Sequence, residues 1–444
     1  MLAATNLASQ LSHEHLGCVL FFCSAEYDLG RLGSALEHSF QGVRVCGCTS
    51  AGEITPDGYG RGYITAIGFD SRYFAIDCAL IRELDRFTLQ DAQGVIDGLL
   101  STCRDARLAP VKGNTFAITL LDGLSSREEL VLATLNSALG TIPQFGGSAG
   151  DDERLANTHV FYDGQFHTGA ATVLLVNTPL DFRVFSTHHM VERSEKLVVT
   201  DACAESRTVY ELNAEPAADA YARAVGVDVE ALDRKVFALR PMGVKIGGHY
   251  FVRSVQRVNP DKSLTFYCAV ETGIVMTAMA PESLLDSVRT QIEAAEQVVG
   301  PPLVTIGCDC FLRRLEAELT GEVEAVSEFL RHHKVIGFNT YGEQFDGMHI
   351  NQTFTGEYIS HNVISSGRCW VVLVERQLTS RRISVFNTHK DPNGGQSSRS
   401  CVFFNGSSCN HLYKIAIKNS GCITTSDFKM LNFAIKRATC TGSA

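Results

Sequence analysis

Two distant segments of this 444-residue chain share one glycine spacing. Residues 47–53 and 337–343 both read G-x-x-x-x-G-E, and each follows a strand-like run and a helical pattern. A third glycine-rich segment, 144–152, also follows a strand and a helix. The repetition predicts a duplication whose glycine turns meet in one cleft, although ordinary turn chemistry explains so short a match equally well. No Lys-Ser/Thr follows the glycines, which excludes a nucleotide phosphate loop.

Hydrophobic periodicity predicts an α/β fold with mixed sheets and helices. Short apolar runs indicate buried strands, and apolar residues at helical spacing separate them. From about residue 228 the pattern changes to an antiparallel meander, with the turn-forming residues 259–262 between two strands. Residues 312–332 are predicted to form one long helix.

The composition narrows the class of protein. Apolar residues make up 45% of the chain, enough for a large core, yet no apolar run approaches the ~20 residues of a membrane helix. The first basic residue is Arg31, so a secretory signal is not expected, and the odd count of 15 cysteines favours reduced, buried thiols in a cytoplasmic protein. The net charge of −10 argues against nucleic-acid binding.

Residues 357–444 differ from the rest of the chain. They are rich in Ser, Asn, Thr and basic residues, nearly lack acidic ones and contain the only tryptophan, Trp370. Residues 370–375 could form a strand and 428–436 a short helix. We interpret 357–444 as an atypical basic extension that is poorly ordered or foreign to the rest of the chain.

Four groups of motifs resemble the FIST sensory proteins. They read GCTSAGEI over 47–54, DGLSSREE over 122–129 with GGSAGDD over 146–152, VYELN over 209–213, and HINQTF over 349–354. The resemblance implies a FIST N-terminal sensory domain over 15–215 and a FIST C-terminal domain over 216–356. The family closes with one more hydrophobic strand, and here Glu357 and the residues after it stand in that place.

Further details are similar to the FIST proteins that sense nitric oxide through haem. They are HHMV over 188–191, RPMGVKIG over 240–247, CFLRRL over 310–315 and FNTYGE over 338–343. This resemblance implies a cytoplasmic haem-binding protein that regulates a partner histidine kinase or cyclic-di-GMP enzyme. A homo-oligomer stays open.

Haem iron needs an axial ligand, most often a neutral imidazole. His188 and His189 follow a strand-like run, so one ring faces each side of it, and His349 lies beside the Gly342–Glu343 turn. These three histidines are the candidate iron ligands, with one or two of them serving at most. Ligation by the thiolate of Cys308 or Cys310 is an alternative.

A second hypothesis is a haem-free sensor that binds a small ligand such as an amino acid in the glycine-turn cleft. The residues that would line this cleft come from all three glycine segments: Gly47, Thr49, Gly52, Glu53, Gly146, Gly147, Asp151, Gly342 and Glu343. A third hypothesis, a hydrolase using these carboxylates, is less favoured because no catalytic motif accompanies them. We therefore expect a regulatory binding protein without catalytic residues.

Overall fold

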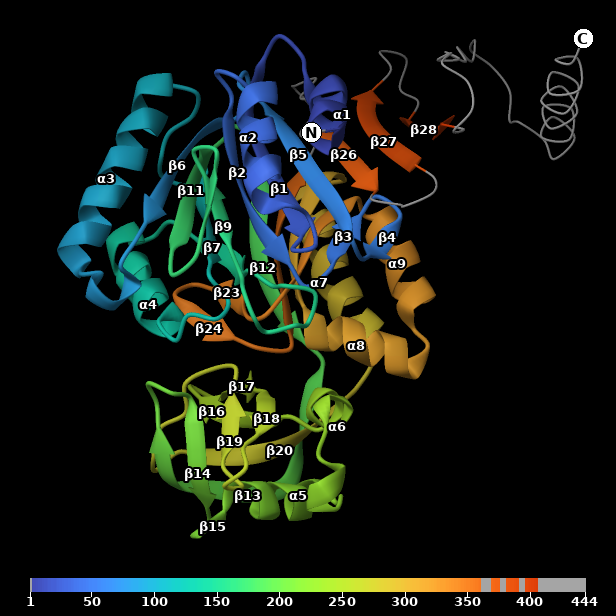
Figure 1. The fold of residues 1–444 in the computed structure, drawn as a ribbon. Coiled ribbons are helices and arrows are strands. Elements are labelled where there is room, and N and C mark those ends of the chain that lie inside the picture. The colour runs from blue at the N-terminus through green and yellow to red at the C-terminus, as the bar shows by residue number, and fades with distance from the viewer. Residues whose placement is uncertain (1, 361–368, 376–380, 391–395, 406–444) are drawn as a thin grey trace, which may run out of the picture. The chain divides into compact units, whose positions relative to one another are not determined.

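The computed structural model describes residues 2–360, 369–375, 381–390 and 396–405 (Figure 1). These residues form mixed β-sheets with α-helices, which confirms the α/β class. Three units with the same connectivity build most of the fold. Each consists of a strand, a helical segment, a second strand parallel to the first, a short hairpin, and a third strand antiparallel to the first.

Each unit spans one continuous stretch of the chain. Unit 1 contains β1 (Leu16–Ser24), α2 (Leu29–Ser39), β2 (Arg44–Ser50), β3 (Glu53–Thr55), β4 (Gly58–Gly60) and β5 (Tyr63–Asp70). Unit 2 contains β7 (Thr115–Leu121), α4 (Glu128–Leu139), β8 (Gln144–Ser148), β9 (Val160–Tyr162), β10 (Gln165–His167) and β11 (Ala171–Asn177). Unit 3 contains β21 (Pro302–Cys310), α8 (Phe311–Thr320), α9 (Val323–His332), β22 (Val335–Thr340), β23 (Glu343–Phe345), β24 (Met348–Ile350) and β25 (Thr353–Ser360).

The units exchange their hairpins in a ring. The hairpin of unit 1 pairs with β22 of unit 3, that of unit 2 with β2 of unit 1, and that of unit 3 with β8 of unit 2. Each of the three sheets to which the units contribute is therefore assembled from more than one unit, and no unit completes its own sheet.

The strand after each unit is exchanged in the same way. It pairs with the third strand of the next unit: β6 (Ala75–Ile81) with β11, β12 (Phe182–His188) with β25, and β26 (Cys369–Glu375) with β5. Residues on both sides of position 216 thus share one sheet. Residues 357–360 belong to β25, and β27 (Arg381–Lys390) and β28 (Gln396–Asn405) continue the sheet beyond β26. Residues 428–436 lie outside the described part.

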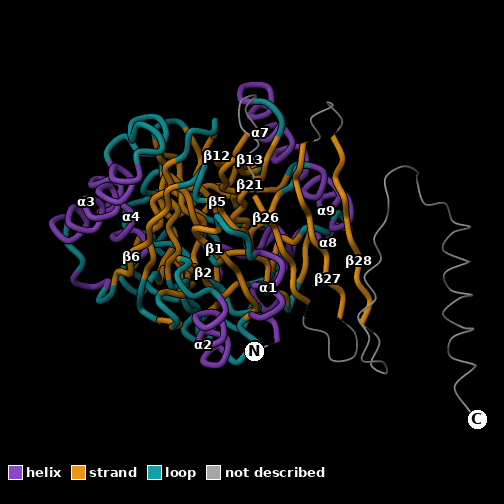
Figure 2. Tube along the Cα trace, turned by 90° about the horizontal axis from the view of Figure 1, so that it is seen from above, coloured by secondary structure: helices purple, strands orange, loops and turns teal. Residues whose placement is uncertain are grey.

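Helices cover the outer faces of the three sheets, and Figure 2 shows the strands gathered between them. In sequence order the covering pairs are α1 (Leu2–Leu11) with α2, α3 (Leu89–Ala106) with α4, and α7 (Leu284–Val299) with α9. The inner faces share one core, in which the rings of Phe22 and Phe338, from units 1 and 3, stack at 4.4 Å between centroids.

The chain between units 2 and 3 forms a separate antiparallel sheet with its own core. Its elements are β13 (Met190–Cys203), β14 (Thr208–Leu212), β15 (Glu215–Pro216), α5 (Ala217–Val225), α6 (Arg234–Leu239), β16 (Met242–Ile246), β17 (His249–Arg253), β18 (Val255–Val258), β19 (Leu264–Phe266) and β20 (Val275–Pro281). The predicted turn at 259–262 connects β18 to β19, and two backbone hydrogen bonds close it.

One predicted helix is wrong. Residues 312–332 form two helices, α8 and α9, because Gly321 adopts a left-handed φ of 78° and ends α8. The expected buried thiols are found: the ten cysteines between Cys18 and Cys310 are free, and all of them but Cys203 are buried.

Candidate functional site

The three glycine turns meet, as predicted, but their backbone groups form hydrogen bonds with one another. The amide of Ala51 donates to the carbonyl of Asn339 at 2.9 Å, and that of Gly150 donates to Thr49 at 3.0 Å. The amide of Ser148 donates to Gly342 at 2.8 Å, which closes the ring. These amides are therefore used inside the protein, and all nine residues expected to line a cleft are buried.

The first glycine of each turn lets two strands approach closely. A Cβ at Gly47, Gly146 or Gly337 would stand 2.2, 1.9 or 1.7 Å from a carbonyl oxygen of the preceding parallel strand. The second glycine of the G-x-x-x-x-G-E motif makes room for a basic side chain. A Cβ would come within 1.7 Å of Arg314 Nη1 at Gly52 and within 1.9 Å of His349 Nε2 at Gly342. Packing therefore accounts for these glycines without a ligand. Gly147 is also enclosed, with a Cβ there 2.4 Å from Thr340 Cγ2.

The carboxyl groups of the turns are also satisfied internally. Glu53 accepts hydrogen bonds from Ser50 and from the amide of Tyr63, and Glu343 accepts from Thr340 and Thr353. Burial raises the pKa of Glu53 to about 8 and that of Glu343 to about 7. The two acids thus fix hairpins at equivalent places in units 1 and 3.

Asp151 fixes the third turn. Its carboxylate accepts hydrogen bonds from the amides of Leu155, Ala156 and Asn157 at 2.7–2.8 Å, and from the hydroxyl of Tyr341. A groove of about 420 Å³ lies along α1 and α2, and none of the candidate ligand-binding or iron-binding residues lines it.

His189 is buried and both of its ring nitrogens are engaged. Nε2 lies 2.8 Å from both carboxylate oxygens of Glu316, and Nδ1 lies 2.7 Å from Arg313 Nη1. Burial, and then the charge of Arg313, holds the pKa of His189 well below its usual value. Because a guanidinium only donates, the neutral ring accepts at Nδ1 and donates from Nε2. His189 therefore has no free nitrogen for iron.

His188 is exposed at the end of β12. The pKa of His188 is lowered, first by burial of part of the ring and then by the charges of Arg313 and His249. A hydrogen bond with the backbone of Met190 acts in the opposite direction and raises it. The ring is therefore neutral near pH 7. Close to it in the chain, Met190 forms a small apolar cluster with Val252 and Met279, and Tyr250 packs against that cluster.

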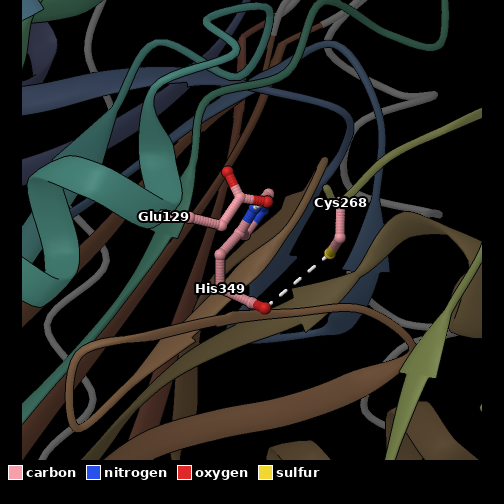
Figure 3. Close-up of side chains that lie close together, drawn as sticks. All are labelled: Glu129, Cys268 and His349. Carbon is pink, nitrogen blue, oxygen red and sulfur yellow. Dashed lines mark hydrogen bonds and ion pairs between the residues drawn. The ribbon is translucent and has the colours of Figure 1, made fainter. Parts of the chain in front are cut away.

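His349 lies in a cluster that the sequence did not reveal. Its Nδ1 is 3.2 Å from Glu129 Oε1, and its backbone carbonyl accepts a hydrogen bond from Cys268 Sγ at 3.7 Å (Figure 3). One ligand atom from each of Glu129, Cys268 and His349 lies within 4.8 Å of the others. Burial alone would lower the pKa of His349, but Cys268 and then Glu129 raise it well above its usual value.

The three members of this cluster come from different parts of the fold. Glu129 belongs to the first turn of α4, Cys268 comes shortly after β19, and His349 lies on β24. No spacing rule links positions so far apart. The sequence held one signal for this cluster: Glu129 and His349 each belong to one of the motifs that resemble the FIST proteins.

Cys308 and Cys310 lie on β21 and are fully buried. Burial, with a smaller contribution from Glu343, raises the pKa of both thiols well above the usual value. A thiol that resists ionisation is a poor iron ligand.

Comparison with known protein families decides the affiliation. A FIST N domain matches residues 17–215, and a FIST C domain matches residues 217–346. The chain is a FIST protein. FIST domains are sensory domains of signal transduction, so this FIST protein has a sensory role.

No curated protein and no solved structure gives a significant match to the FIST chain. Among its described residues, no helix combines the length and the apolar character needed to cross a membrane. The ligand must therefore be argued from the residues themselves.

Proposed function

We propose that this FIST protein binds haem through His188 and senses nitric oxide. The observation that carries the proposal is the contrast among the three candidate histidines. His189 has both nitrogens engaged, and His349 is packed with Nε2 against Gly342 and Nδ1 against Glu129. His188 combines an exposed ring with a neutral state, as an axial ligand requires.

The surroundings of His188 suit a porphyrin. A metal-binding histidine is usually oriented by donating the N–H of its other ring nitrogen to an acceptor such as a backbone carbonyl, and the backbone of Met190 accepts such a hydrogen bond from His188 here. Met190, Val252 and Met279 form a buried apolar cluster that begins two residues along the chain, and Arg313 brings positive charge near the ring. When bound, haem would supply an iron centre that takes up nitric oxide.

The position of His188 favours transmission of a signal. In β12 it pairs with Thr353 of β25, and the chain continues through the buried His189 into β13 of the inserted sheet. A force on His188 thus acts where the three-unit body joins the inserted sheet. We propose that the resulting shift changes contacts with a partner histidine kinase or cyclic-di-GMP enzyme.

The test is a haemin titration of the full-length chain, monitored by absorption spectroscopy. We expect a saturable Soret band at one haem per chain that shifts with nitric oxide after reduction. His188→Ala should abolish or displace this band, whereas the control His38→Ala, an exposed histidine of α2, should retain it.

Two results would contradict the proposal. One is a broad signal that never saturates, and the other is an unchanged spectrum in His188→Ala. In the first case, a thermal shift with an amino acid would instead support the haem-free sensor.

A further inference from the structure

The cluster of Glu129, Cys268 and His349 offers three different donor types within a small space. A carboxylate oxygen, a thiol sulfur and an imidazole nitrogen all lie within 4.8 Å of one another. Zinc bonds of about 2.0–2.3 Å place the donors of a tetrahedral site roughly 3.3–3.8 Å apart. The contact of 3.2 Å between His349 Nδ1 and Glu129 Oε1 is already close to this separation. Small side-chain movements would therefore close the set around an ion.

We propose that Glu129, Cys268 and His349 form a binding site for a divalent cation of the zinc class. Mixed sulfur, nitrogen and oxygen donors favour zinc over the hard cations calcium and magnesium. Three protein ligands leave a fourth position for water or a small molecule, as in exchangeable zinc sites. The proposal goes beyond haem sensing, because it uses none of the residues proposed to hold haem.

The donors are held in place by neighbouring groups. Glu129 accepts from Arg207 at 2.7 Å through one carboxylate oxygen and from the amide of Ala269 at 2.8 Å through the other. The thiol of Cys268 lies 3.0 Å from Asn351 Oδ1. Such partners outside the ligand set orient metal ligands and maintain their affinity.

The charge around the site can accept a dication. Arg207 is the nearby cation, and it is already paired with Glu128 at 2.5 Å as well as with Glu129. On binding, the thiol of Cys268 and Nδ1 of the protonated His349 ring each release a proton to solvent. Nε2 keeps its proton while Nδ1 holds the ion. The Cys268 thiolate then adds a further negative charge that offsets the ion.

The site has a path to solvent and joins separate parts of the fold. The side chain of Glu129 is 32% exposed, whereas those of Cys268 and His349 are buried, so an ion would enter past Glu129. Glu129 belongs to unit 2, His349 to the hairpin that unit 3 lends to it, and Cys268 to the inserted sheet region. An ion would thus tie the inserted sheet to the three-unit body.

Cobalt(II) is the probe, because its bond to a thiolate gives a near-ultraviolet charge-transfer absorption. We expect one cobalt per haem-free full-length chain, displaced by zinc. Cys268→Ser should remove the absorption, and His349→Gln should weaken binding by at least about tenfold. Cys203→Ser, at a half-exposed cysteine outside the cluster, is the matched control and should bind as the unaltered chain does.

Circular dichroism shows whether Cys268→Ser or His349→Gln fails to fold. Glu129→Gln then replaces that variant, because it is a milder change that should also weaken cobalt binding. The site is refuted if the unaltered chain shows no thiolate absorption with cobalt, or if folded Cys268→Ser shows it undiminished. Haem binding and cobalt binding by the two variants separate the two proposals. His188→Ala should lose haem and still bind cobalt, whereas Cys268→Ser should lose the cobalt–thiolate absorption and still bind haem.

Discussion

At the scale of single residues, Glu357 is the clearest conflict between sequence and environment. It lies on β25 between Val184 of β12 and Ile306 of β21. Both carboxyl oxygens are buried and have no hydrogen-bond partner among the described residues. Burial raises the pKa of Glu357 well above its usual value, which favours the neutral form of the group. A buried polar group without partners costs stability.

We therefore predict that Glu357→Leu stabilises the protein by about 1–3 kcal/mol, the usual cost of an unsatisfied buried polar group. Denaturant unfolding at pH 7 measures this change. The control is Glu343→Leu, which removes an equally buried carboxyl that has hydrogen-bond partners and should destabilise the protein. Destabilisation by Glu357→Leu as well would show that its carboxyl has a partner or a packing role.

At the scale of elements, Glu53 fixes the start of the exchanged hairpin β3–β4. It bonds to Ser50 at the end of β2 and to the amide of Tyr63 at the start of β5, so one side chain ties three strands. Two further charged groups act on it: Asp152 raises its pKa and Arg314 lowers it, and burial dominates both. The stability of this hairpin therefore depends on pH.

Since the pKa of Glu53 is about 8 in the fold and 4.5 for the free side chain, the folded state holds its proton more tightly. Its contribution to stability is complete below pH 4.5 and is lost as the pH rises toward 8. Between pH 4.5 and 8, we predict that the free energy of unfolding of Glu53→Gln falls less steeply with pH than that of the unaltered chain. The difference in slope is up to about 1.4 kcal/mol per pH unit. Urea unfolding across the pH range tests this, with the exposed Glu230→Gln as control. Parallel curves for Glu53→Gln and the unaltered chain would contradict it.

At the scale of the whole molecule, local sequence patterns predicted most of the longer strands and most helices, because burial and periodicity are local signals. They also indicated that segments 47–53, 144–152 and 337–343 belong together. The hairpin exchange was not predictable, because β3 pairs with β22 across nearly the whole described chain and no local rule specifies such partners. For the same reason Cys268 could not be placed beside His349, and the second glycine of each motif could not be assigned to a buried basic side chain.

The ring of exchanges gives the last prediction. β6 and β12 complete the sheets of units 2 and 3, and β26 takes the equivalent place beside β5 along residues 63–69. A chain ending at Ser360 would leave the buried strand β5 at a sheet edge, with backbone groups unpaired.

We predict that chain 1–360 unfolds at least about 5 °C below chain 1–375 and self-associates more, since the loss of a paired strand costs several kcal/mol. Differential scanning calorimetry and light scattering make the comparison. Chain 1–390, which keeps β26 and β27 and ends before β28, is the control expected to match 1–375. If 1–360 and 1–375 melt together as monomers, β26 does not complete the first sheet.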